Sequence, residues 1–361
     1  MEQERPLRVL CIGDVHIKIN NIKESKSLIE NILQKVVEIS PDLIVVMGDI
    51  LDRHESIHVV PRTLATKFLI NLSELRKTYV LIGNHDRPNN SDFLSDYHPF
   101  VGVGRENLII CDKVIQDQVG DRKFLFVPYV YPGRFIEAIQ TLRPEPVSEW
   151  IQGINCIFAH QEFYGTSMGV VVSTVGDKWP LEYPYIISGH IHDYCRPQSN
   201  IVYIGTPHQN AFGESENKTI SLFTFTKGPF SDFNGERTKD DPGPEEQRID
   251  LKLMKRLVCQ ISCGAVVSWI PPEGYIIKLI IEGTNSEIKA VMKLDYIKKL
   301  TKLGIKVVYN TIDEINIGVN QKIKPEEIRL PYATRLKNHI QTDPGKFYWF
   351  NYLFTKVGGD L

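Results

Sequence analysis

Five short segments of the chain combine histidine with aspartate or asparagine, or place a histidine alone, directly after an apolar run. They are Asp14-Val-His16, Gly48-Asp49-Ile-Leu-Asp52, Gly83-Asn84-His85-Asp86, Ala159-His160 and Gly189-His190-Ile-His192. Functional sites of open α/β sheets form where strands end, so the five segments can meet at one edge. Carboxylates and imidazoles without thiolates suit divalent Mn, Fe, Zn or Ni better than Mg or Ca alone. The pattern therefore predicts a metal centre.

The number of candidate ligands predicts two metal ions. Seven positions are too many for one ion, and they suit two ions about 3.5–4 Å apart that share a carboxylate. We expect Asp49 to be shared, because it is central in chain order and ends the most apolar run. One such segment alone is more often a capped turn. Five of the ten histidines lie in these segments, however, which favours the metal centre over five unrelated turns.

Strand and helix patterns alternate around the first three segments. Buried strands are predicted at 8–13, 43–47 and 79–82, with helices at 28–37 and about 61–77. This alternation indicates βαβ units with largely parallel strands. From 107 to 226 the pattern changes to strands with few helices. We therefore expect an α+β or α/β fold, namely a two-layer β sandwich flanked by helices.

A second unit is predicted behind a linker. Residues 228–248 are rich in Pro, Gly and charge, which is typical of a flexible linker, and they separate domains at 1–227 and 249–361. Strands at 275–281 and 305–309 enclose a helix that can run from a capping box at Thr284 to Lys302, giving a small α/β domain. Residues 275–361 carry 14 Lys and Arg against 9 Asp and Glu, a net charge of +5.

Composition excludes several other classes of protein. With 361 residues, 42% hydrophobic and 24% charged, the chain is globular and long enough for two domains. Its net charge of −2 gives no sign of nucleic-acid binding by the whole molecule. There is neither a transmembrane run nor a secretory signal, and the six cysteines form no CxxC pair. We expect a cytoplasmic protein without a membrane partner.

The ordered motifs DVH, GDILD, GNHD, AH and GHIH resemble the calcineurin-like metallophosphoesterase superfamily over residues 8–226. The resemblance implies two metal sites, one formed by Asp14, His16, Asp49 and His192, and the other by Asp49, Asn84, His160 and His190. It also implies that His85 faces the leaving oxygen and that the carboxylate of Asp52 orients His85. The metal is expected to be Mn²⁺, with Mg²⁺, Fe²⁺ or Zn²⁺ as alternatives.

Further features resemble the SbcD-type DNA-repair nucleases. They are Gly205-Thr-Pro207 followed by Phe212-Gly-Glu214, Pro61-Arg-Thr-Leu64, Val127-Pro-Tyr129, and the C-terminal unit, which is similar in place to the capping domain of that family. This resemblance implies a DNA exonuclease or endonuclease of repair or recombination, which hydrolyses phosphodiesters with a metal-activated hydroxide. A small-molecule or cyclic-nucleotide phosphodiesterase is an alternative, although such enzymes usually lack the C-terminal unit.

A protein Ser/Thr phosphatase is a weaker alternative. Those enzymes carry motifs of the form GDxxDRG and GNHE. This chain has the arginine of the first motif, as Arg53, but it has His54 and Asp86 at the glycine and glutamate positions. The C-terminal unit could also serve only dimerisation or stability.

The C-terminal helix is expected to bind DNA through lysines on its solvated face, namely Lys289, Lys293, Lys298, Lys299 and Lys302. Its apolar positions, including Met292 and Leu303, should face the sheet. Expected partners are DNA, a second copy of the chain, and an SMC-like ABC ATPase of SbcC type. The ATPase would dock within 310–361, on the helix-like stretch 325–339 or the aromatic run 347–350.

Overall fold

The computed structural model describes residues 5–54, 56–169, 171–226 and 243–312. Its first six-stranded sheet has the order β14-β13-β1-β2-β3-β4. The strands are β1 (Leu7–Ile12), β2 (Leu43–Val46), β3 (Thr78–Leu81), β4 (Leu108–Cys111), β13 (Ile220–Phe225) and β14 (Glu245–Ile249). Strands β1 to β4 run parallel, and β13 pairs antiparallel with both β1 and β14.

A second six-stranded sheet faces the first, in the order β11-β12-β10-β7-β6-β5. Its strands are β5 (Ile115–Val119), β6 (Arg122–Val127), β7 (Cys156–His160), β10 (Tyr185–Gly189), β11 (Cys195–Gln198) and β12 (Ile201–Tyr203). The four central strands run parallel, whereas β5 and β11 are antiparallel edge strands. The short strands β8 (Ser167–Met168) and β9 (Val171–Val172) form a separate hairpin.

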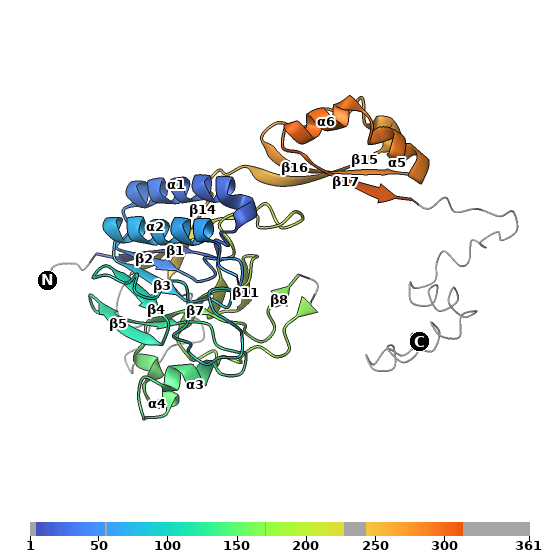
Figure 1. Cartoon of the computed structure of the whole chain (residues 1–361). Coiled ribbons are helices and arrows are strands. Elements are labelled where there is room, and N and C mark those ends of the chain that lie inside the picture. The colour runs from blue at the N-terminus through green and yellow to red at the C-terminus, as the bar shows by residue number, and fades with distance from the viewer. Residues whose placement is uncertain (1–4, 55, 170, 227–242, 313–361) are drawn as a thin grey trace, which may run out of the picture.

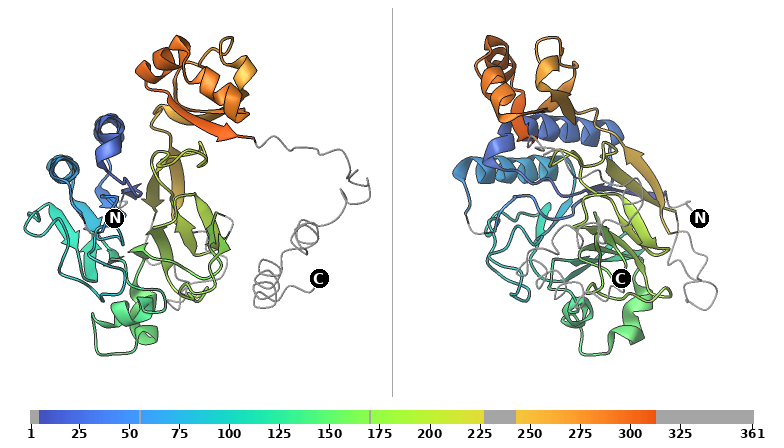
Figure 2. Two further views of the ribbon diagram at one scale, coloured as in Figure 1. Left: turned by 45° about the vertical axis from the view of Figure 1, so that its right-hand side comes forward. Right: turned by 90° about the vertical axis from the view of Figure 1, so that its right-hand side faces the viewer.

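Aromatic and aliphatic side chains fill the space between the two sheets. Tyr79 of the first sheet stacks on Phe126 of the second, with ring centroids 3.8 Å apart, and Phe126 in turn stacks on Phe158. Helices α1 (Ile22–Ile39) and α2 (Val59–Leu75) cover the outer face of the first sheet, and α3 (Phe135–Gln140) and α4 (Val147–Trp150) cover that of the second (Figures 1 and 2). The predicted two-layer sandwich flanked by helices is confirmed.

The helix between the first two predicted strands ends as its sequence requires. Ser40 follows α1 in the left-handed region, with φ of 50°, and its amide donates to the carbonyl of Val36. Pro41 comes next and has no amide hydrogen with which to continue the helix. Single turns of 3₁₀ helix occur at η1 (Ile19–Asn21), η2 (Ile151–Gly153) and η3 (Cys263–Ala265).

The C-terminal module is a separate three-stranded parallel sheet with its own apolar core. Its strands are β15 (Lys255–Ser262), β16 (Tyr275–Gly283) and β17 (Lys306–Thr311). Thr284 and Glu287 form the predicted capping box, but the expected single helix is two, α5 (Asn285–Val291) and α6 (Asp295–Lys302). Both lie on the side of the sheet that is turned away from the core (Figures 1 and 2).

This break in the helix corrects the expected packing. Met292 and Leu303 are 53% and 65% exposed, so they do not face the sheet as predicted. Ile297 of α6 is buried instead, and Leu294 packs against the same core. The turn after Val291 rotates the second helix, which changes the set of residues that point inward.

The expected linker is partly a strand. Residues 245–248 belong to β14, which extends the first sheet by pairing with β13. Residues 227–242 lie outside the described residues, as does the predicted ATPase-docking region beyond Ile312. The boundaries at 227 and 249 stay predictions, although the core sheet continues to Ile249. No helix in the described ranges could cross a membrane.

Candidate metal centre

Strand ends from both sheets bring the seven predicted ligands to one edge of the sandwich. Asp14 and His16 follow β1, Asp49 follows β2, Asn84 follows β3, His160 ends β7, and His190 and His192 follow β10. Because β1, β2 and β3 run parallel, as do β7 and β10, the ends within each sheet lie side by side. The structure therefore gathers the residues as the sequence predicts.

The backbone at this edge adopts a conformation that most residues avoid. His16, Asp49 and His190 have φ angles of 48°, 49° and 82°, in the left-handed region. Such strain persists where the surrounding structure enforces it, and it is concentrated at functional sites. Position 83 must be a glycine for a different reason, because a Cβ atom there would lie 2.2 Å from Oδ1 of Asp49.

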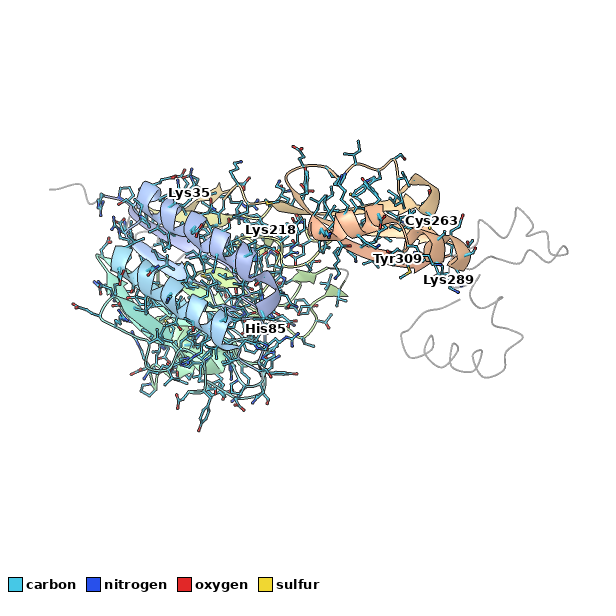
Figure 3. All side chains as sticks on the ribbon, turned by 45° about the horizontal axis from the view of Figure 1, so that its top comes forward. Lys35, His85, Lys218, Cys263, Lys289 and Tyr309 are labelled. Atoms are coloured by element: carbon cyan, nitrogen blue, oxygen red, sulfur yellow. The ribbon has the colours of Figure 1, made fainter. Side chains whose placement is uncertain are left out.

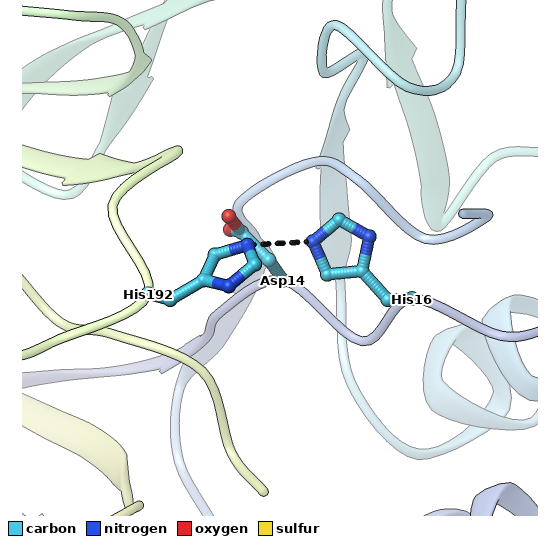
Figure 4. A group of neighbouring side chains, drawn as sticks. All are labelled: Asp14, His16 and His192. Atoms are coloured by element: carbon cyan, nitrogen blue, oxygen red, sulfur yellow. Dashed lines mark hydrogen bonds between the residues drawn. The ribbon is translucent and has the colours of Figure 1, made fainter. Parts of the chain in front are cut away.

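Asp14, His16 and His192 form the first group of candidate ligands, with one ligand atom each, all within 4.8 Å of one another (Figure 4). The Nε2 atoms of His16 and His192 are 3.0 Å apart, so both rings aim at one point. Oδ1 of Asp14 and Nδ1 of His16 are buried and have no hydrogen-bond partner in the described part of the chain. The orphaned carboxylate oxygen of Asp14 fits a cation.

Asp49, His160 and His190 form the second group, and Asn84 joins them. Oδ1 of Asn84 lies 3.0 Å from Nε2 of His160 and 2.8 Å from Nδ1 of His190. Nδ1 of His160 lies 2.7 Å from the carbonyl oxygen of Met47 and donates to it, which turns Nε2 towards the centre. A hydrogen bond on the far nitrogen is the usual way to orient a metal-binding histidine.

Asp49 lies between the two groups. Its Oδ2 atom is 3.4 Å from Nε2 of His160 and 3.9 Å from Nε2 of His16. Its Oδ1 atom accepts a hydrogen bond of 2.8 Å from the amide of His85. This is the position that a shared carboxylate needs, and the donor set fits two divalent ions.

Protonation in the cluster reflects crowding of charges away from water. Burial raises the pKa of Asp14 to about 6. Burial lowers the pKa of His16 and of His190 to about 3, so both rings are neutral at pH 7 and keep a lone pair for a ligand. Although burial opposes the charge on His160, Asp49 and Asp14 raise its pKa to about 9. Because only a neutral imidazole can bind a metal ion, protonation of His160 and metal binding oppose each other.

The carboxylate of Asp52 does not orient His85, which corrects the role implied for it. Nδ1 of His85 donates to the main-chain carbonyl of Asp52 at 2.8 Å. The side chain of Asp52 turns to Lys18 instead, at 2.8 Å from Nζ. His85 also lies close enough to His16 and Asp49 to be a metal ligand by distance, so its assignment to the leaving group stays a prediction.

Asp86 organises the loops that carry the ligands, although its motif had suggested no role for it. Its buried carboxylate accepts hydrogen bonds from the amides of Ile50, Leu51 and Gly83, at 3.0 to 3.3 Å. It therefore ties the end of β2 to the end of β3. Burial, together with the nearby charge of Asp49, raises its pKa to about 7.

Glu214 supports His192 from behind. Its Oε1 atom is 3.5 Å from Nδ1 of His192, and its Oε2 atom accepts from the amide of Asn210. Burial opposes its charge, but His192, Asn210 and Lys218 lower its pKa to about 2, so it is ionised at pH 7. The sequence signal that could have identified this residue was the motif Phe212-Gly-Glu214.

The loop that carries Glu214 also holds the C-terminal module. Arg256 at the start of β15 donates its amide to Oε1 of Gln209 at 2.6 Å and its Nε to the Gln209 carbonyl at 2.8 Å. Its guanidinium also pairs with Glu24 of α1 and lies over the ring of Phe212. The module is therefore fixed to the same loop that positions a metal ligand.

The five predicted DNA-binding lysines are not part of the centre. Lys289, Lys293, Lys298, Lys299 and Lys302 are all exposed on α5, α6 and the turn between them. Figure 3 shows Lys289 on the module and His85 on the core. Lys298 pairs with Asp295 at 2.9 Å.

Comparisons with known proteins show the family to which the chain is similar. A family model described as calcineurin-like phosphoesterase matches residues 7–194. "Putative phosphoesterase 244L" of Invertebrate iridescent virus 6 is 37% identical over 79% of this chain and 97% of its own length. "Putative phosphoesterase 078R" of Invertebrate iridescent virus 3 is 35% identical over 85% of each chain. A solved dimetal phosphatase from Danio rerio aligns with 68% of this chain and 99% of its own, at 10% identity and a TM-score of 0.40.

The chain belongs to the calcineurin-like phosphoesterase family. It is a metallophosphoesterase, and the candidate ligand groups fit the two divalent ions that this family implies. The resemblance to the superfamily is thus confirmed.

We predict that Asp49→Asn lowers metal content from two ions towards one per chain and abolishes phosphodiesterase activity. The reason is that Oδ2 of Asp49 lies 3.4 Å from Nε2 of His160 in one group and 3.9 Å from Nε2 of His16 beside the other. Metal analysis after dialysis, beside turnover of bis-p-nitrophenyl phosphate, measures both effects. Asp117→Asn is the control, since Asp117 lies on edge strand β5 and pairs with Lys77. A variant with two ions and near-normal turnover would remove the bridging role.

Glu214→Gln is expected to weaken metal binding while leaving one ion in place. Loss of the carboxylate behind a ligating histidine typically lowers metal affinity about 10-fold to 100-fold. Calorimetric titration with Mn²⁺ should show this loss in one of two binding steps. Glu216→Gln is the matched control, because Glu216 lies two residues away and pairs with Lys255 rather than with a histidine. Equal affinities in the two variants would contradict the assignment.

Proposed function

We propose that this metallophosphoesterase cleaves phosphodiester bonds of DNA and is an SbcD-type nuclease of repair or recombination. The supporting observation is the attachment of the module to the metal centre. The loop from Gly205 to Glu214 approaches His192 at one end and holds Arg256 of the module further along. A small diester reaches only the centre, whereas a polymer can contact both parts.

Two divalent ions, when bound, supply a nucleophile near neutral pH and offset the negative charge that builds up on the phosphate. The chain itself serves the leaving oxygen. Because Nδ1 of His85 donates to the carbonyl of Asp52, its Nε2 atom is left to hold a proton for that oxygen. Asp49 fixes the same residue through its amide, so His85 is held at both main chain and ring.

The lysines of the module suit binding to the phosphate backbone, which depends on charge and not on sequence. They are exposed on α5, α6 and the turn between them, and these two helices lie on the side of the module's sheet that is turned away from the core (Figure 1). A nucleic acid that contacts them and the centre must therefore extend past the edge of the module. Long duplexes should use these contacts and short ones should not.

The proposed partners follow the same resemblance. We infer a homodimer and an ATPase partner of SbcC type, in a compartment that contains DNA. The residues expected to dock the ATPase lie almost entirely outside the described ranges. Co-purification of a chain with an ABC ATPase, and the mass in solution, would test these two proposals.

We predict Mn²⁺-dependent cleavage of end-labelled duplex DNA, with slower or no hydrolysis of a phosphopeptide. Charge reversal at Lys298, Lys299 and Lys302 should weaken binding and cleavage of a duplex of about 40 base pairs, and lower the salt dependence of binding, because phosphate contacts release counterions. A duplex of about 8 base pairs and bis-p-nitrophenyl phosphate should be cleaved nearly as before.

The control for this experiment reverses three exposed lysines of the core, Lys26, Lys67 and Lys123, which gives the same change in net charge. If the two triple variants bind the long duplex equally, the module's lysines have no specific part. Hydrolysis of a cyclic nucleotide or a phosphopeptide without any cleavage of DNA would replace the nuclease by one of the alternative enzymes.

His85→Ala is expected to keep both ions and to lose about 10²-fold to 10⁴-fold in rate on DNA, the usual size of general acid catalysis. The loss should shrink with bis-p-nitrophenyl phosphate, whose leaving group needs no proton. His58→Ala is the control, since His58 is an exposed histidine on the neighbouring loop. Loss of a metal ion from the His85 variant would make His85 a ligand.

A further inference from the structure

A hollow of about 300 Å³ opens directly beside His85. Residues that line it include His85, His54, Arg53, Ile57, Tyr97 and Val101. His85 also lies within ligand distance of Asp49 and His16, so one side chain borders both the metal centre and the hollow. If His85 serves the leaving oxygen, the group attached to that oxygen points towards this hollow.

Three large apolar side chains that line the hollow are exposed. Tyr97, Val101 and Ile57 are 75%, 62% and 45% exposed. Large apolar side chains gathered beside a catalytic centre mark a place where a ligand is bound. The ring of Tyr97 makes no aromatic stacking contact in the described structure, so its face is open to a flat ligand.

The same hollow has a cation at its edge. Arg53 is exposed, and its side chain makes no ion pair or hydrogen bond with any residue that the structure describes. It borders this hollow and also a neighbouring one lined by Lys18 and Asn20. An open guanidinium at the boundary between two hollows suits a phosphate that lies between two units of a polymer.

The position of these groups is tied to the catalytic histidine. His54 stacks on His85 with ring centroids 4.9 Å apart and an angle of 17° between the rings. Arg53 follows Asp52 directly, and the carbonyl of Asp52 accepts from Nδ1 of His85. The loop that forms the wall of the hollow is therefore the loop that aims His85.

We propose that this hollow binds the nucleotide on the leaving side of the scissile bond. Its base stacks on Tyr97 against Val101 and Ile57, and its next phosphate is held by Arg53. The chemistry that favours a nucleotide is the combination of an exposed aromatic ring and an unpaired cation that line the same hollow. This inference rests on the proposed nuclease function and adds a subsite to it.

The test uses the full-length protein and single-stranded oligonucleotides that carry one abasic residue, on the leaving side or on the other side of the cleaved bond. Base stacking contributes about 1–3 kcal/mol, so the leaving-side abasic residue should raise KM about 5-fold to 100-fold for the unmodified protein. Tyr97→Ala should raise KM for the intact oligonucleotide by a similar factor and show no further rise with the leaving-side abasic residue. Its response to the abasic residue on the other side should be unchanged.

Two further variants separate stacking from general damage. Tyr97→Phe keeps the ring and should behave like the unmodified protein. Arg53→Ala should raise KM for the oligonucleotide. Arg105→Ala, three residues before β4 and therefore at the amino ends of the parallel strands, should not. Fluorescence anisotropy with a labelled oligonucleotide in EDTA should give the same order of dissociation constants without turnover.

Several results would overturn the subsite. If Tyr97→Ala keeps the full response to the leaving-side abasic residue, the base does not stack there. If that abasic residue has no effect on the unmodified protein while intact DNA is cleaved, the hollow binds no base and the nuclease function stands. A rise in KM for a phosphopeptide but not for DNA would assign the hollow to a peptide. Absence of any DNA cleavage would overturn the proposed function and the subsite together.

Discussion

Asp49 holds a carboxylate, almost fully shielded from water, among imidazoles that come from opposite sheets. A buried charge is expensive to maintain unless partners surround it. Here the partners are His16 from the first sheet and His160 from the second, together with the amide of His85. The two sheets must therefore keep a fixed separation at this edge, and the stacked rings of Tyr79 and Phe126 in the interior keep it. The fold and the site impose the same geometry on each other.

Much of this arrangement could be predicted from the sequence because each ligand follows an apolar run. A strand that is buried on both faces must be apolar along its length, and a polar motif can begin only where the strand ends. Alternation with helices then makes the strands parallel, so their ends share an edge. The resemblance carried by the ordered motifs assigned each ligand to one of two metal sites. Composition and spacing alone do not contain that assignment.

The differences between the sequence predictions and the structure have local physical causes. The sequence cannot show whether His85 contacts the side-chain carboxylate of Asp52 or its main-chain carbonyl. In the structure Lys18 attracts the carboxylate, which leaves the carbonyl for His85. Strand β14 was hidden because it is an edge strand with charged, exposed residues at Glu245 and Arg248. The break before α6 has neither Pro nor Gly to announce it, since the chain there is Met-Lys-Leu.

Residues that act from behind the ligands were the hardest to predict. Asp86 contacts amides more than thirty residues away in the loop after β2, and Glu214 lies 22 positions after His192. Such contacts exist only after the chain has folded, so a motif shows the residue but not its partner. Both side chains are carboxylates that hold a loop or a ring in place, and the ligands depend on them for orientation.

The connection between the core and the module is short. Strand β14 ends at Ile249 and β15 begins at Lys255, so five residues join the two sheets, and Arg256 clamps the far end of that connection. A tether of this length sets a local concentration that does not depend on how dilute the protein is. For a ligand that is already bound to the module, meeting the metal centre is an intramolecular event. The rate of that encounter is therefore independent of protein concentration, and dilution affects only the first contact.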